Sequence, residues 1–285
     1  MFLDRDYLEK RLSLAGKKAI VTGSSGGIGA AIAKSLVRFG AFVTVLGRNP
    51  EKIRQTVSEI GEIGGACDSW AFDVGSAEES EQFFREYGEK HGSPDIFVAN
   101  AGMSVFKYLT EMENQEMDRL IETDLKGVIY GLRWAGNQME KNGGGNIIIV
   151  TSVNAYYALP SQALYSGIKS ALENIARSMA ADLGEYGVRV NTLAPGGVNT
   201  DLGGHHTNEV RPMAIPLGHQ ALPEEIGDIV PLMCTDAFGY MTGSTILADG
   251  GLMLRHSGYA QRWEWREKMA ERRRQEQEKT KEDQK

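Results

Sequence analysis

A short apolar run at 19–21 leads into the stretch Thr22-Gly23-Ser24-Ser25-Gly26-Gly27-Ile28-Gly29, and a segment with helical apolar spacing, 28–39, follows. A strand, a glycine-rich turn and a helix N-terminus in this order predict a pyrophosphate site. Small residues let the backbone approach the phosphates, and the helix N-terminus offers free N–H groups at the positive end of its dipole. An ordinary tight turn is the alternative interpretation of the same residues.

Apolar runs and helical segments alternate along the rest of the chain. The expected strands are 19–21, 41–46, 69–72, 96–99, 147–151, 189–193 and 244–247. The expected helices are 28–39, 50–63, 77–91, 112–139 and 163–186. Short buried runs that alternate with helices are typical of βαβ units. We therefore expect an α/β fold with a parallel sheet of seven strands that carries helices on both faces, in a single domain.

Composition and charge limit the classes of function. With 41% hydrophobic and 24% charged residues, the chain has the composition of a soluble globular protein. A net charge of −7 argues against a general affinity for nucleic acid or for an anionic membrane. Neither kind of partner is therefore expected, although a local basic patch stays compatible with this total.

Several features favour a cytoplasmic protein. Cys67 and Cys234 lie far apart in the sequence and form no C-x-x-C motif, which fits a reducing compartment. No apolar run reaches the length of a membrane span, and the first eleven residues lack the continuous apolar core of a signal peptide. No H-x-x-x-H or similar pairing is present, so no metal is expected.

The glycine spacing points to a known family. It reads Gly23, three residues, then Gly27-x-Gly29, with Thr22 in front, rather than G-x-G-x-x-G. This spacing resembles the short-chain dehydrogenase/reductase family. The resemblance covers about 14–254 and implies a Rossmann-type, doubly wound sheet and a nicotinamide dinucleotide cofactor.

The end of the second expected strand bears on the choice of cofactor. A site specific for NAD places an acid here, on the ribose 2′-hydroxyl. This sequence has Gly47 at that position, followed by Arg48. An arginine would pair with a 2′-phosphate that a carboxylate would repel, so NADP is expected rather than NAD. A solvated loop arginine is the alternative interpretation of Arg48.

The resemblance implies further cofactor contacts. Asp73-Val74 matches the family position that meets the adenine, Asn100-Ala101-Gly102 matches the Asn-Ala-Gly motif, and Pro195 to Thr200 matches the turn beside the nicotinamide. The expected cofactor-binding residues are Gly23, Ser24, Ser25, Gly27, Ile28, Gly29, Arg48, Asn49, Asp73, Val74, Asn100, Ala101, Gly102, Tyr165, Lys169, Pro195, Gly196, Val198 and Thr200.

Tyr165-x-x-x-Lys169 and Ser152 form the candidate catalytic set. Residues four apart share one face of a helix, so the phenol and the ammonium can meet the same substrate and cofactor. A hydride that moves to or from a carbonyl carbon leaves a proton to be moved on the oxygen. A free phenol, with a pKa of about 10, is inefficient as a base at neutral pH, and a nearby ammonium favours its phenolate. The resemblance implies that Ser152 donates a hydrogen bond to the substrate oxygen.

Asp124 departs from the family pattern. An asparagine is expected in the long helix before the fifth strand, and alignment on Leu125-x-Gly127 puts Asp124 in its place. The family uses the backbone carbonyl of this residue to hold a water that links the lysine to solvent, so we expect activity to be retained. The carboxylate is also expected near Lys169, where it would raise the pKa of the lysine.

The expected substrate contacts are Ser152, Asn154, Tyr157, Tyr165 and His205, with Tyr156 beside them. A wall of hydrogen-bonding groups and tyrosines favours a polyol, sugar or sugar acid. A 3-oxoacyl thioester or a hydroxysteroid stays open, because tyrosine faces also pack against flat apolar ligands. The glycines beside His205 suggest a lid over 201–218, and solvated histidines are the alternative.

The chain divides into an N-terminal extension (1–13), a catalytic domain (14–254) and a densely charged tail (255–285). The tail is typical of a solvated helix or a disordered segment, and a partner-binding helix anchored by Trp263 and Trp265 is the alternative. The resemblance implies a homo-oligomer, a tetramer or a dimer. Two functions stay open: an NADP-dependent oxidoreductase that interconverts a secondary alcohol and a ketone, or a catalytically weak NADP-binding sensor or scaffold.

Overall fold

Seven parallel strands form one sheet in the computed structural model, which describes residues 4–200, 215–254 and 271. The strands are β1 (Lys18–Val21), β2 (Phe42–Gly47), β3 (Cys67–Ala71), β4 (Ile96–Ala99), β5 (Gly145–Val150), β6 (Val188–Pro195) and β7 (Thr245–Ala248). Their order across the sheet is β3-β2-β1-β4-β5-β6-β7, and every neighbouring pair is parallel. This arrangement confirms the expected doubly wound sheet.

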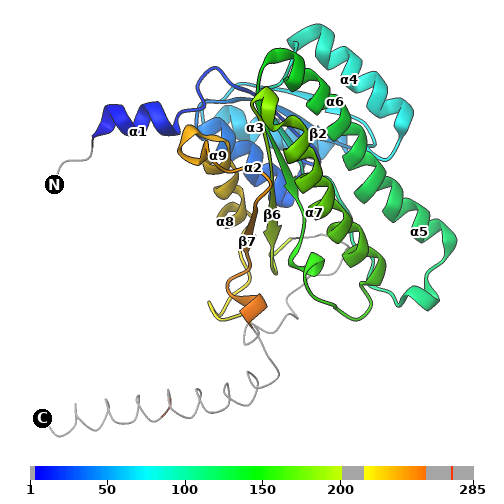
Figure 1. Cartoon of the computed structure of the whole chain (residues 1–285). Helices are drawn as coiled ribbons and strands as arrows, with labels where there is room; N and C mark the ends of the chain where they lie inside the picture. The colour runs from blue at the N-terminus through cyan, green and yellow to red at the C-terminus, as the bar shows by residue number, and fades with distance from the viewer. Residues whose placement is uncertain (1–3, 201–214, 255–270, 272–285) are drawn as a thin grey trace, which may run out of the picture.

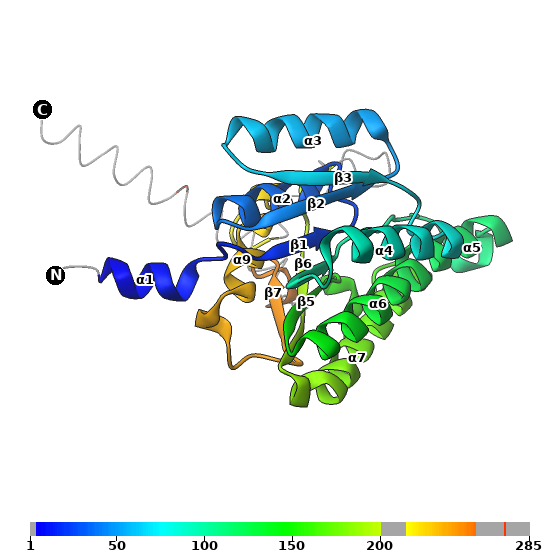
Figure 2. The ribbon, with the colours of Figure 1, turned by 90° about the horizontal axis from the view of Figure 1, so that it is seen from above.

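Helices cover both faces of the sheet (Figures 1 and 2). One face carries α2 (Gly27–Arg38), α3 (Pro50–Glu62), α8 (Pro223–Gly227) and α9 (Ile229–Cys234). The other carries α4 (Ala77–His91), α5 (Asn114–Ile121), α6 (Gly127–Asn142) and α7 (Ala163–Leu183). Short 3₁₀ segments are η1 (Leu109–Glu111), η3 (Val153–Ala155), η4 (Gly184–Tyr186), η7 (Asp236–Phe238) and η8 (Leu252–Leu254).

Alternation along each strand divides the core into two layers. In β4, for example, Ile96 and Val98 pack toward α2, whereas Phe97 packs toward α4 and α6. Both sets are almost fully buried, which is why these strands read as continuous apolar runs in the sequence. Burial on both faces fixes the strand register, because a slip of one residue would exchange the two layers.

The chain reverses its direction of travel across the sheet at β1. Strands β2 and β3 extend the sheet on one side of β1, and β4 to β7 extend it on the other. Ligands of doubly wound sheets bind outside the carboxyl ends of the strands at such a switch point. The segments after β1 and β4 therefore mark the place where a ligand is expected.

The long helix expected over 112–139 differs from the structure in one respect. It consists of α5 and α6 joined by a π-helical turn, η2 (Glu122–Lys126). Such turns insert one residue into a helix and are frequent at functional sites. Periodicity alone missed this insertion because the apolar residues on both sides of it still face the same core, as Leu120 and Val128 do.

Three helices were not expected from the sequence. Helices α8 and α9 are short and follow a segment that we interpreted as a loop, and α1 (Arg5–Leu12) has no buried residue. Arg11 of α1 donates a hydrogen bond to the carbonyl of Asp236, 2.5 Å away, which attaches α1 to η7.

Among the described residues, no helix is long and apolar enough to cross a membrane. His205 and most of the charged tail lie outside the described residues.

Close packing of α6 on β4 gives a test of the core. A Cβ atom on Gly131 would lie 2.4 Å from Cζ of Phe97, so Gly131→Ala should lower the free energy of unfolding by about 1–3 kcal/mol. This loss should outweigh the gain in helix propensity, which is about 1 kcal/mol. Urea unfolding measures it, with Gly61→Ala as the control, because no atom lies within 4 Å of a Cβ there. Equal stability of the two variants would contradict the packing.

Candidate active site

The turn after β1 and the first turn of α2 each contain a glycine that no larger residue could replace without a clash. Gly23 has φ of +65°, and a Cβ atom on it would lie 2.8 Å from Cα of Ala101. A Cβ on Gly29 would lie 2.3 Å from the carbonyl oxygen of Gly23 and 2.5 Å from Nδ2 of Asn100. The turn is therefore closely packed against the segment after β4, and α2 begins directly behind it.

Thr22 and Asn100 join the two strands at the switch point. Oγ1 of Thr22 accepts hydrogen bonds from the backbone N–H groups of Asn100 and Ala101, at 3.0 Å each. Nδ2 of Asn100 donates to the carbonyl oxygens of Thr22 (3.0 Å) and Gly23 (3.3 Å). The Asn100 side chain thus fixes the glycine turn relative to β4.

The two serines of the turn have different surroundings. Ser24 is fully buried, and its hydroxyl donates to the carbonyl of Val21 (2.7 Å) and accepts from the N–H of Leu46 (2.9 Å). Ser24 therefore joins β1 to β2, and its hydroxyl is engaged in hydrogen bonds within the protein. Ser25 is only half-buried. A Cβ on Gly47 would lie 2.4 Å from Oγ of Ser25, so the glycine at the end of β2 makes room for this serine.

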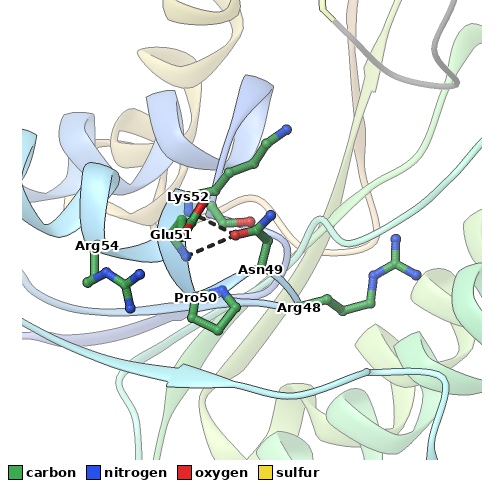
Figure 3. Close-up of a pocket in the computed structure, with 7 residues that line it drawn as sticks. Arg48, Asn49, Pro50, Glu51, Lys52 and Arg54 are labelled. Carbon is green, nitrogen blue, oxygen red and sulfur yellow. Dashed lines mark hydrogen bonds between the residues drawn. The ribbon is translucent and has the colours of Figure 1, made fainter.

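A surface pocket of ≈ 800 Å³ opens beside Ser25. Its lining residues are Ser25, Arg48, Asn49, Pro50, Glu51, Lys52 and Arg54. Figure 3 shows that Asn49 faces the first turn of α3, where its Oδ1 accepts from the N–H groups of Glu51 (2.9 Å) and Lys52 (3.2 Å). Asn49 therefore caps α3. Its side-chain oxygen, which we expected to contact the cofactor, is bonded to the helix instead.

The charge of this pocket is positive. Arg48, Lys52 and Arg54 outnumber the single acid Glu51, and Arg48 points away from α3 in Figure 3. Nη1 of Arg48 lies 3.8 Å from Oδ2 of Asp73, the residue expected at the adenine. Both side chains are about half exposed, so a ligand can reach them.

Tyr165 and Lys169 of the candidate catalytic set lie in the first two turns of α7. Nζ of Lys169 lies 5.3 Å from the centre of the Tyr165 ring, as four-residue spacing on a helix requires. Lys169 is 4% exposed, whereas Tyr165 is only partly buried. The phenol can therefore reach a ligand while the ammonium stays inside.

Ser152 follows β5, and the segment behind it packs on α7. Ser152 is the N-cap of η3, and its Oγ accepts a hydrogen bond from the N–H of Asn154 (3.2 Å). Oγ of Ser170 on α7 donates to the carbonyl of Ala155 on η3 (2.8 Å). These bonds place the segment of Ser152 beside the helix that carries Tyr165.

Asp124 forms a buried ion pair with Lys169, as we expected from its position. Its Oδ2 lies 3.2 Å from Nζ of Lys169, and its Oδ1 accepts from the N–H of Met103 (2.7 Å). Asp124 is 0% exposed and lies in the π-helical turn. Burial alone would lower the pKa of Lys169, but the Asp124 carboxylate raises it above its ordinary value, with a smaller effect of Tyr165 in the same direction. Burial raises the pKa of Asp124 in turn, against the opposing effects of Lys169 and Met103.

The segment after β6 reaches the glycine turn. Pro195 ends β6, and a Cβ on Gly196 would lie 2.8 Å from Cα of Asp249, so these two backbones touch. Val198 forms an isolated parallel bridge with Ala221. A Cβ on Gly27 would lie 3.5 Å from Cγ2 of Thr200. The expected nicotinamide segment and the expected pyrophosphate turn are therefore neighbours.

The residues of the expected substrate wall lie in different surroundings. Asn154 and Tyr157 are partly buried next to Ser152. The hydroxyl of Tyr156 instead donates to Oγ1 of Thr245 (3.0 Å), so this tyrosine faces β7.

Gln162, which the sequence analysis did not single out, is the N-cap residue of α7, is 2% exposed and has its Nε2 3.2 Å from Oγ of Ser104. Among the described residues, no cluster of His, Cys, Asp and Glu could hold a metal ion.

The ion pair of Asp124 predicts a pH-dependent cost for Asp124→Asn. In the parent, the pKa of Lys169 is higher in the folded state than in the unfolded chain, where it is about 10.4. The ion pair therefore stabilises the folded state fully below a pH of about 10.4, and this stabilisation is lost as the pH rises through the pKa of the folded state. In the variant, burial is opposed only by the smaller effect of Tyr165 and lowers the pKa of Lys169, so the folded state disfavours the charged lysine until the pH approaches about 10.4. The variant should therefore be less stable by about 3 kcal/mol near neutral pH.

The same argument requires this difference to shrink as the pH rises from about 7 to about 10. Urea unfolding at a series of pH values measures it. Glu59→Gln is the control, because the pair of Glu59 with Lys34 is partly exposed and its loss should stay small throughout. A difference for Asp124→Asn that is constant with pH would refute the ion pair.

Comparison with known proteins gives a family for this site. A family model described as Enoyl-(Acyl carrier protein) reductase matches residues 23–253. The curated relative "Dehydrogenase/reductase SDR family member 4" of Sus scrofa is 31% identical over 250 residues, which are 86% of this chain and 90% of the relative.

Two solved structures are similar over nearly their whole length. A gluconate 5-dehydrogenase from Burkholderia cenocepacia J2315, in complex with NADP and tartrate, has a TM-score of 0.82 and 29% identity, covering 87% of this chain and 99% of that one. A 7α-hydroxysteroid dehydrogenase, complexed with NADH and 7-oxo glycochenodeoxycholic acid, has a TM-score of 0.81 and 31% identity, covering 88% and 98%. The chain belongs to the short-chain dehydrogenase/reductase family.

Proposed function

We propose that the chain is an NADP-dependent oxidoreductase that interconverts a secondary alcohol and a ketone. The observation that carries this proposal is the packing of η3 on α7, which puts Ser152 beside the helix of Tyr165 and the buried Lys169. That the chain is an oxidoreductase of its family follows from the comparisons. The cofactor, the reaction and the substrate are our inference.

Each catalytic side chain has one task in this reaction. Ser152 donates a hydrogen bond to the substrate oxygen and stabilises the negative charge that develops there. Tyr165 gives its phenolic proton to that oxygen during reduction and takes it back during oxidation. Lys169, held charged by Asp124, favours the phenolate that remains after the proton has moved. A bound NADPH supplies the hydride.

The glycine turn fits a dinucleotide. A Cβ on Gly26, the N-cap residue of α2, would meet no atom within 4 Å, and α2 begins without a side-chain cap on its first N–H groups within the described part of the chain. These N–H groups would bind the pyrophosphate together with Ser25. Following the family motifs, we assign further contacts to Gly27, Ile28, Val74, Ala101, Gly102, Pro195, Gly196, Val198 and Thr200.

Arg48 supports NADP over NAD. It stands beside Ser25 in the positive pocket, and Gly47 replaces the acid that would bind a ribose 2′-hydroxyl. The similar structures differ in this respect, because one holds NADP and the other NADH. The local charge of this chain is therefore the argument for NADP.

Asp124 should serve in place of the family asparagine. Its backbone carbonyl keeps the role that the family gives to this position, and its side chain adds the ion pair with Lys169. We infer that the enzyme is active with this residue.

We propose a polyol, sugar or sugar acid as substrate. Asn154, Tyr157 and the Gln162–Ser104 pair supply polar groups beside Ser152 and Tyr165. The similar gluconate 5-dehydrogenase holds tartrate, a polar hydroxy acid, which agrees with such a site. His205 stays a proposed contact outside the described residues.

A second substrate class, ketones with an apolar body, is favoured by one observation. Phe106, Tyr108 and Leu109 are about half exposed on the loop after β4. This loop lies next to the segment that leads into α7, because the N–H of Lys107 donates to the carbonyl of Ser161 (3.0 Å). An apolar rim of this kind would suit a hydroxysteroid or a 3-oxoacyl thioester.

We further propose a cytoplasmic homo-oligomer, a tetramer or a dimer, whose catalytic domain spans 14–254. Helices α6 and α7 are the proposed interface, and the Asp249-Gly250-Gly251 segment lies near it in the family pattern. The partners are then a small-molecule substrate and copies of the same chain, with no nucleic acid, membrane or metal.

The cofactor assignment predicts the effect of Arg48→Ala. Loss of the guanidinium should weaken NADPH binding by about 1.5–3 kcal/mol, a factor of roughly 13–160, and leave NADH binding unchanged. Titration of the fluorescence of each cofactor measures both. Arg38→Ala is the control, because Arg38 is an exposed arginine at the far end of α2. Stronger binding of NADH than of NADPH by the parent would overturn the assignment.

Tyr165→Phe separates the enzyme from a sensor or scaffold. Without the phenolic proton, turnover should fall roughly 10²–10⁴-fold, while NADPH binding persists. The assay follows NADPH oxidation with a panel of sugar-acid, steroid and 3-oxoacyl thioester ketones, which also identifies the substrate class. A parent that binds NADPH but turns over none of the panel would favour the sensor.

A further inference from the structure

A buried glutamate lies one helical turn beyond the catalytic lysine. Glu173 is 2% exposed, and its carboxylate accepts hydrogen bonds from three threonine hydroxyls. The donors are Oγ1 of Thr151 (2.6 Å), of Thr192 (2.8 Å) and of Thr245 (2.7 Å). Oγ1 of Thr192 also lies 2.8 Å from Oγ1 of Thr245, so these two hydroxyls and the carboxylate form one connected network. Nη1 of Arg177 lies 3.9 Å away on the solvent side.

The three threonines come from three different strand segments. Thr151 directly follows β5 and precedes Ser152, Thr192 lies in β6, and Thr245 begins β7. Strand β6 continues to Pro195, at the start of the proposed nicotinamide segment. One carboxylate on α7 therefore binds the three strands whose ends carry this side of the site.

Glu173 also shares a helix face with the catalytic pair. Tyr165, Lys169 and Glu173 follow one another at intervals of four residues, so they lie in one row along α7. The hydrogen bond between Glu173 and Thr151 therefore fixes this face of α7, which carries Tyr165, relative to the chain at Ser152. Hydrogen bonds to a buried carboxylate are short and strong, which suits them to hold such a position.

A second connection returns to the segment of Ser152. The hydroxyl of Tyr156, which follows η3, donates to Oγ1 of Thr245 (3.0 Å), and Thr245 donates to Glu173. Ser152 is therefore held on both sides, through Thr151 before it and through Tyr156 after it. Both connections end on the same carboxylate.

We propose that Glu173 is a positioning residue that fixes the catalytic helix α7 against the segment of Ser152, through Thr151 on one side and Thr245 with Tyr156 on the other. The inference rests on the proposed function for the roles of Ser152 and Tyr165. It assigns no contact with substrate or cofactor to Glu173. Replacing Glu173 should therefore slow the chemical step and leave cofactor binding almost unchanged.

Four variants test this role. Thr151→Val removes one hydroxyl and keeps the shape, and Thr151→Ser restores the hydroxyl. Glu173→Gln keeps a hydrogen-bonding group, and Glu173→Leu removes all three bonds. Thr44→Val is the control, because Thr44 is a buried threonine on β2 outside this network. If Glu173→Leu fails to fold, the comparison of Thr151→Val with Thr151→Ser, together with Glu173→Gln, still tests the role.

The first readout is the kinetics with the substrate found in the panel. A displacement of about 1 Å between reacting groups costs roughly 10²-fold, so Glu173→Leu should lower kcat by about that factor. We expect Thr151→Val to lower kcat roughly tenfold and Thr151→Ser to recover it, with KM and the NADPH Kd changed by less than about threefold. A full kcat in Glu173→Leu, with only the melting temperature lowered, would overturn the proposal.

The second readout needs no turnover. Hydrogen–deuterium exchange of the backbone should rise in 151–157 for Glu173→Leu and Thr151→Val, and stay at the parent level in 96–99 and in Thr44→Val. Failure of the parent to bind NADPH or to turn over the panel counts against the proposed function alone. Unchanged exchange in 151–157 counts against the positioning role, whatever the parent catalyses.

Discussion

The contact between Thr22 and Asn100 is the constraint on which the rest of the site depends. Strands β1 and β4 are parallel neighbours, and the chain leaves them toward opposite sides of the sheet. Four hydrogen bonds made through these two side chains join the segments after the two strands and hold the glycine turn against Ala101. The proposed cofactor site, and with it the place where Tyr165 can meet a ligand, depends on this link.

Elements with strong local signals could be predicted almost to the residue. Helix α4 occupies the expected 77–91 because Ser76 caps its first turn and Gly92, with φ of +73°, ends it. Strand β4 matches 96–99 because both of its faces are buried apolar residues. Strand β6 instead runs on to Pro195, since pairing with β7 extends it and pairing is invisible in a single stretch of sequence.

The parts of the site that the sequence could not reveal depend on contacts between distant segments. The pattern could not distinguish Ser24 from Ser25, because only the approach of Leu46 decides which hydroxyl is buried. Glu173 carried no signal of its own, since its partners come from three strands. Asp124 was found because family motifs flank it, and its closeness to Lys169 followed from that alignment alone.

The π-helical turn between α5 and α6 has a consequence for how Lys169 is held. One added residue in a helix is accommodated within Glu122–Lys126, and Leu120 before the turn and Val128 after it still pack in the same core layer. Asp124 lies inside this turn, where its carboxylate accepts from the N–H of Met103 and pairs with Lys169. The irregular turn thus joins three segments, α5–α6, the segment after β4 and α7, at a single buried carboxylate.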